Sequence, residues 1–283
     1  DGQPLVLRWA KALMHIAKNM TVYVQEDQLL LGRAGHIGRY GILYPELDGD
    51  FLDIAVRDLP TRKTSPATIT AKDAKRVVEE IAPFWKGKTF HEALNTALPP
   101  EIHKLTYDDA NGLNSRFIVN ETASFRSSIQ WVHDYEKILK RGFNGIKRDA
   151  EEKLSRLDPA NPLDQVDKRP FLEAVIIVSD AIVLWARRHA ELAKAMAAKE
   201  TSPQRKHELQ LMAANAEHVP ANPARDFYEA VQSQWFVQMF SRMEQKTGTT
   251  ISNGRMDQYL YPYYKKSLED GSISKERALE LLE

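Results

Sequence analysis

The sequence contains no cysteine among its 283 residues. This absence excludes disulfides, thiolate-bound metals and a cysteine nucleophile within the chain, and it fits a reducing compartment. A bilayer-spanning run of about 20 apolar residues is also missing. The longest apolar stretch, 171–186, is interrupted by Glu173, Ser179 and Asp180, which is typical of a buried helix. Residues 1–6 lack the basic start of a secretory signal, so we expect a cytoplasmic protein.

An excess of charge of either sign is lacking too, because 39 basic residues balance 39 acidic ones. The composition therefore gives no indication of a nucleic acid or an anionic membrane as partner. Hydrophobic residues make up 43% and charged residues 28%, as in ordinary globular proteins. The length suffices for one large or two small domains, and no linker composition divides the chain convincingly.

Hydrophobic spacing predicts a mostly α-helical fold with a few β-strands. The tract 124–157 is predicted to be a long helical tract that is broken or bent near Gly142 and Gly145. The other predicted helices are 5–20, 71–85, 91–97, 169–199, 202–216, 224–243, 258–269 and 274–283. The predicted strands are 21–24, 116–119 and 249–252.

Motifs of common enzyme classes are incomplete in this sequence. His91-Glu92 and His207-Glu208 begin like the zinc-binding H-E-x-x-H pattern, but no second histidine follows, so we expect no metal in this chain. The glycine-rich segment 32–41 lacks the lysine and hydroxyl residue of a phosphate-binding loop and is predicted to form tight turns.

Arg126 and Gln130 form the one candidate binding site that the residues themselves suggest. They are four residues apart in a predicted helix and would therefore share a face. A guanidinium fork beside an amide N–H can hold an oxyanion with several donors. A solvated helix face gives the same pattern, so the residues alone leave both interpretations open.

Several segments, taken in order, resemble the glycyl radical enzyme superfamily, the pyruvate formate-lyase-like group. The most specific is 252–264, with Gly254-Arg-Met-Asp-Gln-Tyr-Leu-Tyr-Pro-Tyr, and it is preceded by 134–139 and 227–232. The resemblance implies that residues 1–283 are the N-terminal portion of a ten-stranded α/β barrel. The final predicted helix has no stop signal, which also suggests truncation.

The resemblance also implies what this chain would lack. The thiyl cysteine, its neighbouring acid and the radical glycine would lie beyond Glu283, so the chain alone is expected to be inactive. An activating enzyme that uses S-adenosylmethionine and an iron–sulfur cluster would install the glycyl radical. The resemblance implies a homodimer in an anaerobic bacterium, with the cytoplasm or a microcompartment as its location.

The subtype follows from a departure within the family pattern. Many relatives carry a Gly-His pair where this sequence has Gln130-Trp131, and that histidine contacts a substrate hydroxyl. The pair Arg126 and Gln130 instead matches the branch that cleaves isethionate to sulfite and acetaldehyde, and there it binds the sulfonate. The alternatives are a choline lyase, a diol dehydratase and a non-catalytic helical scaffold. A choline site needs a carboxylate or an aromatic cage for its quaternary ammonium group, and an arginine in that site would oppose the binding of this cation.

Overall fold

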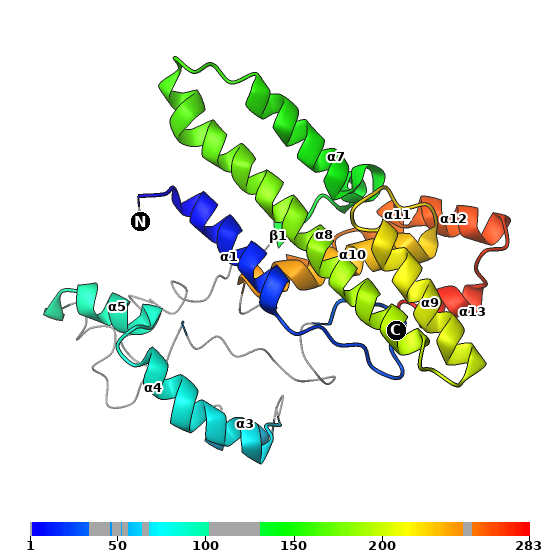
Figure 1. Cartoon of the computed structure of the whole chain (residues 1–283), viewed down its shortest axis with the longest axis horizontal. Helices are drawn as coiled ribbons and strands as arrows, with labels where there is room; N and C mark the ends of the chain where they lie inside the picture. The colour runs from blue at the N-terminus through cyan, green and yellow to red at the C-terminus, as the bar shows by residue number, and fades with distance from the viewer. Residues whose placement is uncertain are drawn as a thin grey trace. The chain divides into compact units, whose positions relative to one another are not determined.

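The chain forms two compact units, which Figure 1 shows in one computed structural model. The first unit contains 1–34, 130–244 and 250–283, and the second contains 35–129 and 245–249. The structure describes residues 2–33, 46, 52, 56–63, 68–101, 131–245 and 251–283.

Helices make up nearly all of the regular structure in these described ranges, as predicted. The elements of the first unit are α1 (Leu5–Asn19), β1 (Trp131–Val132), α7 (Tyr135–Ser155), a π-helical turn (Asp164–Lys168), α8 (Arg169–Ala197), α9 (Pro203–His218), α10 (Phe227–Gln245), β2 (Ile251–Ser252), α11 (Met256–Tyr259), α12 (Tyr261–Glu269) and α13 (Lys275–Glu280). Those of the second are a 3-10 turn (Leu59–Thr61), α3 (Ala71–Arg76), a π-helical turn (Val77–Ile81), α4 (Ala82–Trp85) and α5 (Phe90–Ala97).

Two of the predicted elements are wrong. Residues 21–24 form no strand. The tract 124–157 is not helical throughout, because β1 lies inside it and α7 begins only at Tyr135. The Asp134 side chain caps α7 by accepting a hydrogen bond from Lys137 N at 3.1 Å. The predicted strand 116–119 lies outside the described residues, whereas 249–252 contains β2 as predicted.

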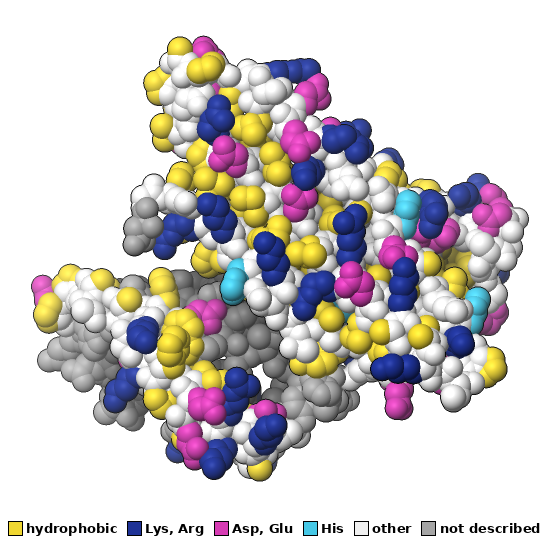
Figure 2. Space-filling view, in the orientation of Figure 1, with side chains coloured by type: hydrophobic (Ala, Val, Ile, Leu, Met, Phe, Trp, Pro, Cys, Tyr) yellow, Lys and Arg dark blue, Asp and Glu magenta, His cyan; other side chains and the backbone are white. Residues whose placement is uncertain are grey.

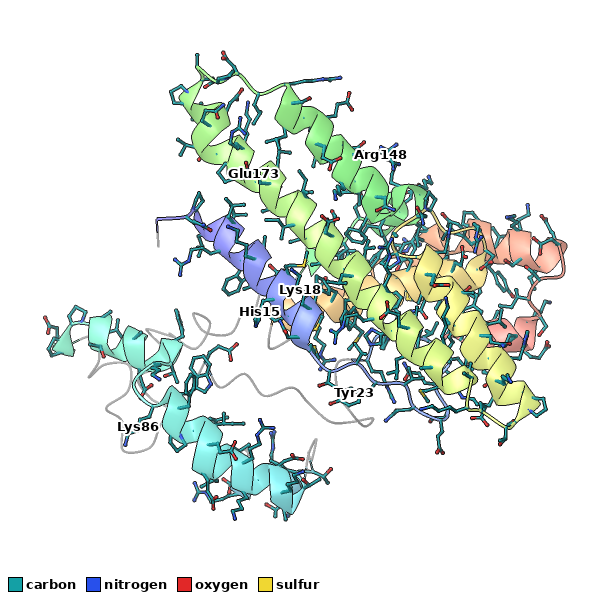
Figure 3. The ribbon with its side chains drawn as sticks, viewed as in Figure 1. His15, Lys18, Tyr23, Lys86, Arg148 and Glu173 are labelled. Carbon is teal, nitrogen blue, oxygen red and sulfur yellow. The ribbon has the colours of Figure 1, made fainter. Side chains whose placement is uncertain are left out.

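Helix α8 is the central element of the first unit. It lies between α1 and α7 in Figure 1 and also packs on α9. Its buried face carries Trp185 among alanines such as Ala186 and Ala190, and small side chains let neighbouring helices approach closely. Arg188 donates to Ala17 O at 2.6 Å, at the end of α1 that His15 and Lys18 mark in Figure 3. One helix thus organises three others.

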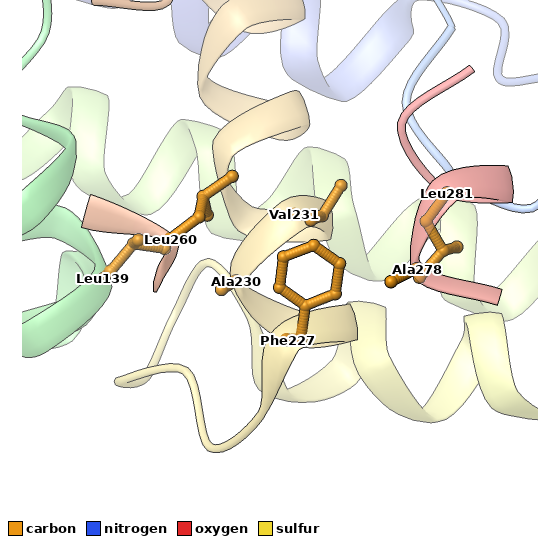
Figure 4. Close-up of a cluster of buried hydrophobic side chains, with 7 residues drawn as sticks. All are labelled: Leu139, Phe227, Ala230, Val231, Leu260, Ala278 and Leu281. Atoms are coloured by element: carbon orange, nitrogen blue, oxygen red, sulfur yellow. The ribbon is translucent and has the colours of Figure 1, made fainter. Parts of the chain in front are cut away.

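A second core lies between α10 and the C-terminal helices (Figure 4). Phe227 and Val231 of α10 lie between Leu139 and Leu260 on one side and Leu281 on the other. The full set of buried residues is Leu139, Phe227, Ala230, Val231, Leu260, Ala278 and Leu281. This core holds α11, α12 and α13 against α10 and so fixes the segment that follows β2.

The break in α7 falls at Gly142, as predicted, while Gly145 does not interrupt the helix. Gly142 has φ 62° and ψ 167°, a conformation that is essentially restricted to glycine. The amides of Phe143 and Asn144 donate to Pro220 O and Ala221 O, each at 2.9 Å. The segment before α10 therefore supplies the backbone acceptors that α7 itself cannot supply at the break.

In the second unit, α5 begins with a capping box. Glu92 N donates to Thr89 Oγ1 at 3.2 Å, and the Glu92 carboxylate accepts from Thr89 N at 3.2 Å. The carboxylate also accepts from Gly87 N at 2.9 Å. Glu92 therefore has a structural role at the start of α5.

The surface mixes charges of both signs, in line with the balanced composition. Figure 2 shows basic and acidic side chains interspersed over the helices of the visible face. None of the helices in the described ranges combines the length and apolar character that crossing a bilayer requires.

His189 in α8 is a fully buried titratable group. Its Nδ1 lies 2.9 Å from Trp185 O, and because a carbonyl only accepts, the neutral ring carries its proton on Nδ1. The rings of Trp185 and Phe236 surround it at centroid distances of 4.6 and 6.1 Å. Burial in this apolar setting lowers the pKa of His189 to about 4.

Acid is therefore expected to destabilise the fold through His189. The pKa is lower in the folded protein (about 4) than the ordinary value of 6.5, so the unfolded chain takes up the proton first. The stabilising contribution is complete above pH 6.5 and is lost as the pH falls through 4, with ~2 kcal/mol already lost at pH 5. Denaturant unfolding measures the free energy of unfolding at pH 7.5 and at pH 5. We expect this free energy to fall less between the two pH values in His189→Leu than in the parent.

Some acid sensitivity should persist in that variant, because burial also lowers the pKa of His133. If the free energy of unfolding falls by the same amount between pH 7.5 and pH 5 in His189→Leu as in the parent, His189 is not the source of this acid sensitivity.

Candidate functional site

The two predicted substrate-binding residues, Arg126 and Gln130, lie outside the described residues. The prediction that these two residues share a helix face required them to lie in a helix, but α7 begins only at Tyr135. Their assignment therefore depends on the family resemblance. The described structure resumes at Trp131, directly after Gln130. The described residues that follow Gln130 in the chain are those of β1.

Strands β1 and β2 pair in parallel over two residues each. Trp131 is opposite Ile251, and Val132 is opposite Ser252. Gly254 follows with φ 62°, and a Cβ atom at this position would lie 2.7 Å from Val132 Cγ1. Glycine therefore lets the chain after β2 pass directly against β1.

A stripe of polar side chains on α10 holds both strands. Gln234, Gln238 and Ser241 are four and three residues apart and so share one face of the helix. Gln234 Nε2 donates to Asn253 Oδ1 at 2.8 Å, after β2. Gln238 Nε2 donates to Ile251 O, within β2, at 2.9 Å. We call these three residues the α10 polar stripe.

His133, just after β1, contacts the same stripe. Ser241 Oγ lies 2.7 Å from both His133 Nε2 and Val237 O. A serine hydroxyl has one hydrogen to donate, and the carbonyl can only accept it. His133 Nε2 is then the donor to Ser241. Burial lowers the pKa of His133, which favours the neutral ring.

Tyr135 connects the stripe to the C-terminal segment. Its hydroxyl donates to Gln238 Oε1 at 2.6 Å, and its ring stacks on Tyr259 at a centroid distance of 5.2 Å. Burial raises the pKa of Tyr135 to about 12, so the phenol stays protonated and remains a donor. The Tyr259 hydroxyl donates to Asn253 O at 2.7 Å. The two tyrosines thus brace the loops after both strands.

A cavity of about 460 Å³ lies beside this assembly. Its lining consists of Val132, His133, Asp134, Tyr135, Glu136, Leu139, Lys140, Arg255, Gln258, Tyr259, Pro262 and Tyr263. Arg255 is paired with Asp257 at 3.1 Å, and Lys140 is paired with Glu136. Since these cations already have carboxylate partners, the lining offers no uncompensated charge for an anion.

Metal binding finds no support in the described part of the chain, where no three histidine or acidic side chains converge. The sequence predicted the strand at 249–252 but missed the α10 polar stripe. The sequence does contain a pattern that indicates this stripe: two glutamines and a serine, spaced four and three residues apart, in a helix that is otherwise largely buried.

Comparison with protein families shows a match over residues 1–283 to the model described as "Pyruvate formate lyase-like". Isethionate sulfite-lyase of Desulfovibrio desulfuricans is 78% identical over the whole chain, and that of Bilophila wadsworthia is 75% identical. The (2S)-3-sulfopropanediol dehydratase of Klebsiella oxytoca is 30% identical. The chain spans 34% of the length of each of these relatives.

Solved structures give a consistent result. The chain superposes on the glycerol-bound B12-independent glycerol dehydratase from Clostridium butyricum with a TM-score of 0.82 and 29% identity. A structure concerned with 1,2-propanediol dehydration in Roseburia inulinivorans gives 0.81 and 33%. Both alignments cover 99% of this chain and 34% of the other.

Proposed function

Because the chain belongs to the pyruvate formate lyase-like family, we propose that it is part of a glycyl radical lyase that cleaves the carbon–sulfur bond of isethionate. The observation that carries this proposal is the 78% identity, over the whole chain, to an isethionate sulfite-lyase. Three further proteins of that name are 69–75% identical. The (2S)-3-sulfopropanediol dehydratase is far more distant, at 30%.

Arg126 and Gln130 are the proposed sulfonate ligands. A sulfonate is a permanent anion with three acceptor oxygens, so removing it from water without matched donors would be costly. An arginine stays ionised and offers a planar fork of donors, and a glutamine amide adds another N–H. Together they would hold the sulfonate and leave the hydroxyl-bearing carbon free to react.

The reaction itself is a balanced fragmentation. Isethionate, HOCH2CH2SO3⁻, gives acetaldehyde and hydrogen sulfite with no external oxidant or reductant. The protein-derived radical supplies the hydrogen-atom chemistry, and this chain has no cysteine that could take part in it. The contribution of this chain is to bind and orient the substrate and to stabilise its charge.

The remaining machinery is proposed to lie in a polypeptide of the relatives' length, of which the present chain would be the N-terminal portion. There β1 and β2 would be strands of the ten-stranded barrel. The reactive cysteine, its neighbouring acid and the radical glycine would lie in the rest. An activating enzyme with S-adenosylmethionine and an iron–sulfur cluster would generate the radical, and the protein would be a cytoplasmic homodimer.

The test is product formation by the full-length protein after anoxic activation. We expect sulfite and acetaldehyde in a 1:1 ratio from isethionate, in proportion to the glycyl radical content measured by electron paramagnetic resonance. Radical-containing protein that releases no sulfite would overturn the substrate assignment.

Diol dehydration is the second candidate, because the superposed structures concern glycerol and 1,2-propanediol. Those structures are only 29–33% identical to the chain. Propanal formation from 1,2-propanediol at a rate above that of sulfite release would favour this candidate.

A further inference from the structure

An apolar groove of about 370 Å³ lies on the first unit, between the start of α10 and the helices α11, α12 and α13. Its buried lining residues are Phe227, Leu260 and Ala278, which also belong to the core in Figure 4. We call it the C-terminal groove. Its walls consist mainly of large apolar or aromatic side chains, namely Met256, Tyr261, Tyr264, Leu279 and Leu282.

Helix α13 and the turn that follows it carry apolar side chains on two sides. Ala278 and Leu281, three residues apart, are buried in the core that α10 shares with these helices (Figure 4). Leu279 and Leu282, also three residues apart, line the C-terminal groove and are 58% and 50% exposed. A surface helix has one apolar stripe, whereas a helix that is apolar on several sides is normally buried. This segment therefore lacks a neighbour for its second apolar side in the described part of the chain.

The tyrosines of α12 show the same division. Tyr263 lines the cavity beside β1, whereas Tyr261 and Tyr264 line the C-terminal groove. The ring of Tyr264 lies edge-on to Phe227 at a centroid distance of 5.3 Å, but Tyr261 is 58% exposed. Tyrosine is enriched in the buried centres of protein interfaces, and soluble proteins rarely expose large contiguous apolar patches. An exposed tyrosine beside two exposed leucines is therefore typical of a contact surface.

The charged residues of the groove do not suit a small ligand. Such a site needs a few converging polar groups that orient the ligand. The charged lining residues are Asp257, which is paired with Arg255 at 3.1 Å, and Lys275, which is exposed. The groove matches the apolar face of another polypeptide segment instead.

We propose that the C-terminal groove is the docking surface for a segment from the remaining two-thirds of the same polypeptide, which packs an apolar face against Tyr261, Leu279 and Leu282. This inference rests on the part of the proposed function that places the chain in a protein of the relatives' length. The chain spans 34% of those relatives, so about two-thirds of such a polypeptide can supply the segment. A segment of the same polypeptide has a high effective concentration at the groove, which favours it over a second copy.

Thiol labelling of the full-length protein before activation measures whether the groove is covered. The chain has no cysteine, so an introduced cysteine is the only thiol among its 283 residues. Leu279→Cys is compared with Glu280→Cys, because the Glu280 side chain is 56% exposed and points about 100° away on the same helix. We expect maleimide to label Leu279→Cys at least about tenfold more slowly, since a covered thiol reacts only when the docked segment opens. Peptide mass spectrometry measures labelling at each position.

Photo-crosslinking identifies what covers the groove. Benzoylphenylalanine replaces Lys275, an exposed residue of the groove lining, in the full-length protein. We expect cross-links to peptides that follow residue 283 in the same polypeptide. On a denaturing gel, such a product keeps the mass of one polypeptide, whereas a link to a second copy doubles this mass.

A smaller difference in labelling between the two cysteine variants would overturn the inference. A product of doubled mass, or no cross-link to peptides after residue 283, would overturn it as well. If Leu279→Cys does not fold, Leu282→Cys decides in the same way. A radical-containing parent that releases no sulfite would remove the substrate assignment, whereas labelling and cross-linking would still decide whether the same polypeptide covers the groove.

Discussion

Replacing Arg126 by alanine is expected to lower kcat/KM for isethionate by about 30-fold to 3,000-fold. Removing one partner of a buried, hydrogen-bonded charge pair costs about 2–5 kcal/mol, and each 1.4 kcal/mol is a factor of ten. On the proposed function, this cost would arise because the sulfonate would leave water without its countercharge. Sulfite release at several isethionate concentrations, per glycyl radical, measures the effect.

Arg126→Lys is the informative control, because it keeps the charge and loses the planar fork. It should retain more activity than Arg126→Ala but less than the parent. Arg141→Ala, which changes an arginine that is paired with Asp149 and about half exposed, should leave kcat/KM within about twofold. Parent-like kcat/KM in Arg126→Ala would refute the sulfonate role of this arginine.

Replacing Gly142 by alanine is expected to destabilise the protein by about 3–5 kcal/mol. The conformation at φ 62° and ψ 167° alone costs of order 1–3 kcal/mol for a residue with a side chain. The new Cβ would also lie 2.4 Å from Ala221 O and 2.5 Å from the carbonyl carbon of Asn222, and backbone atoms cannot move aside cheaply. Denaturant or thermal unfolding would show the loss directly.

Gly145→Ala is the matched control in the same helix. Gly145 has no left-handed backbone, and its nearest contact would be Arg141 Cβ at 3.2 Å, which belongs to a side chain. Alanine favours a helix interior over glycine by about 1 kcal/mol, which offsets the tight contact. We expect a change within about 1 kcal/mol. Similar losses for both variants would show that the break at Gly142 is not the cause.

Local signals in the sequence predicted much of this fold. Hydrophobic spacing located α1 and α8. The predicted helices 202–216 and 274–283 begin at Ser202 and Ser274, whose side chains accept from Arg205 N and Arg277 N in the structure. The break in α7 followed from Gly142. These features depend on residues within one or two turns, which is why the sequence alone indicates them.

The errors occurred where distant residues decide the structure. Trp131 and Val132 were predicted to be helical as part of the tract 124–157, but they pair with Ile251 and Ser252, about 120 residues away. Residues 21–24 have strand-prone side chains and no strand to pair with in the described parts of the chain. Propensity is weaker than tertiary pairing in both cases.

The candidate site was predictable only in part. The family resemblance suggested Arg126 and Gln130, and because both lie outside the described residues, their assignment stays a prediction. The supporting residues Gln238 and Ser241 were missed, because a glutamine or serine in a helix usually faces solvent. Their role becomes visible only when α10 is placed beside β1 and β2.

A competition assay tests the central claim most directly. The activated full-length protein is given equal concentrations of isethionate and 1,2-propanediol in one vessel, and sulfite and propanal are both quantified. The account predicts that sulfite exceeds propanal by at least about 100-fold, because the proposed arginine site requires an anion. Propanal in equal or greater amount would contradict it and assign the chain to a diol dehydratase.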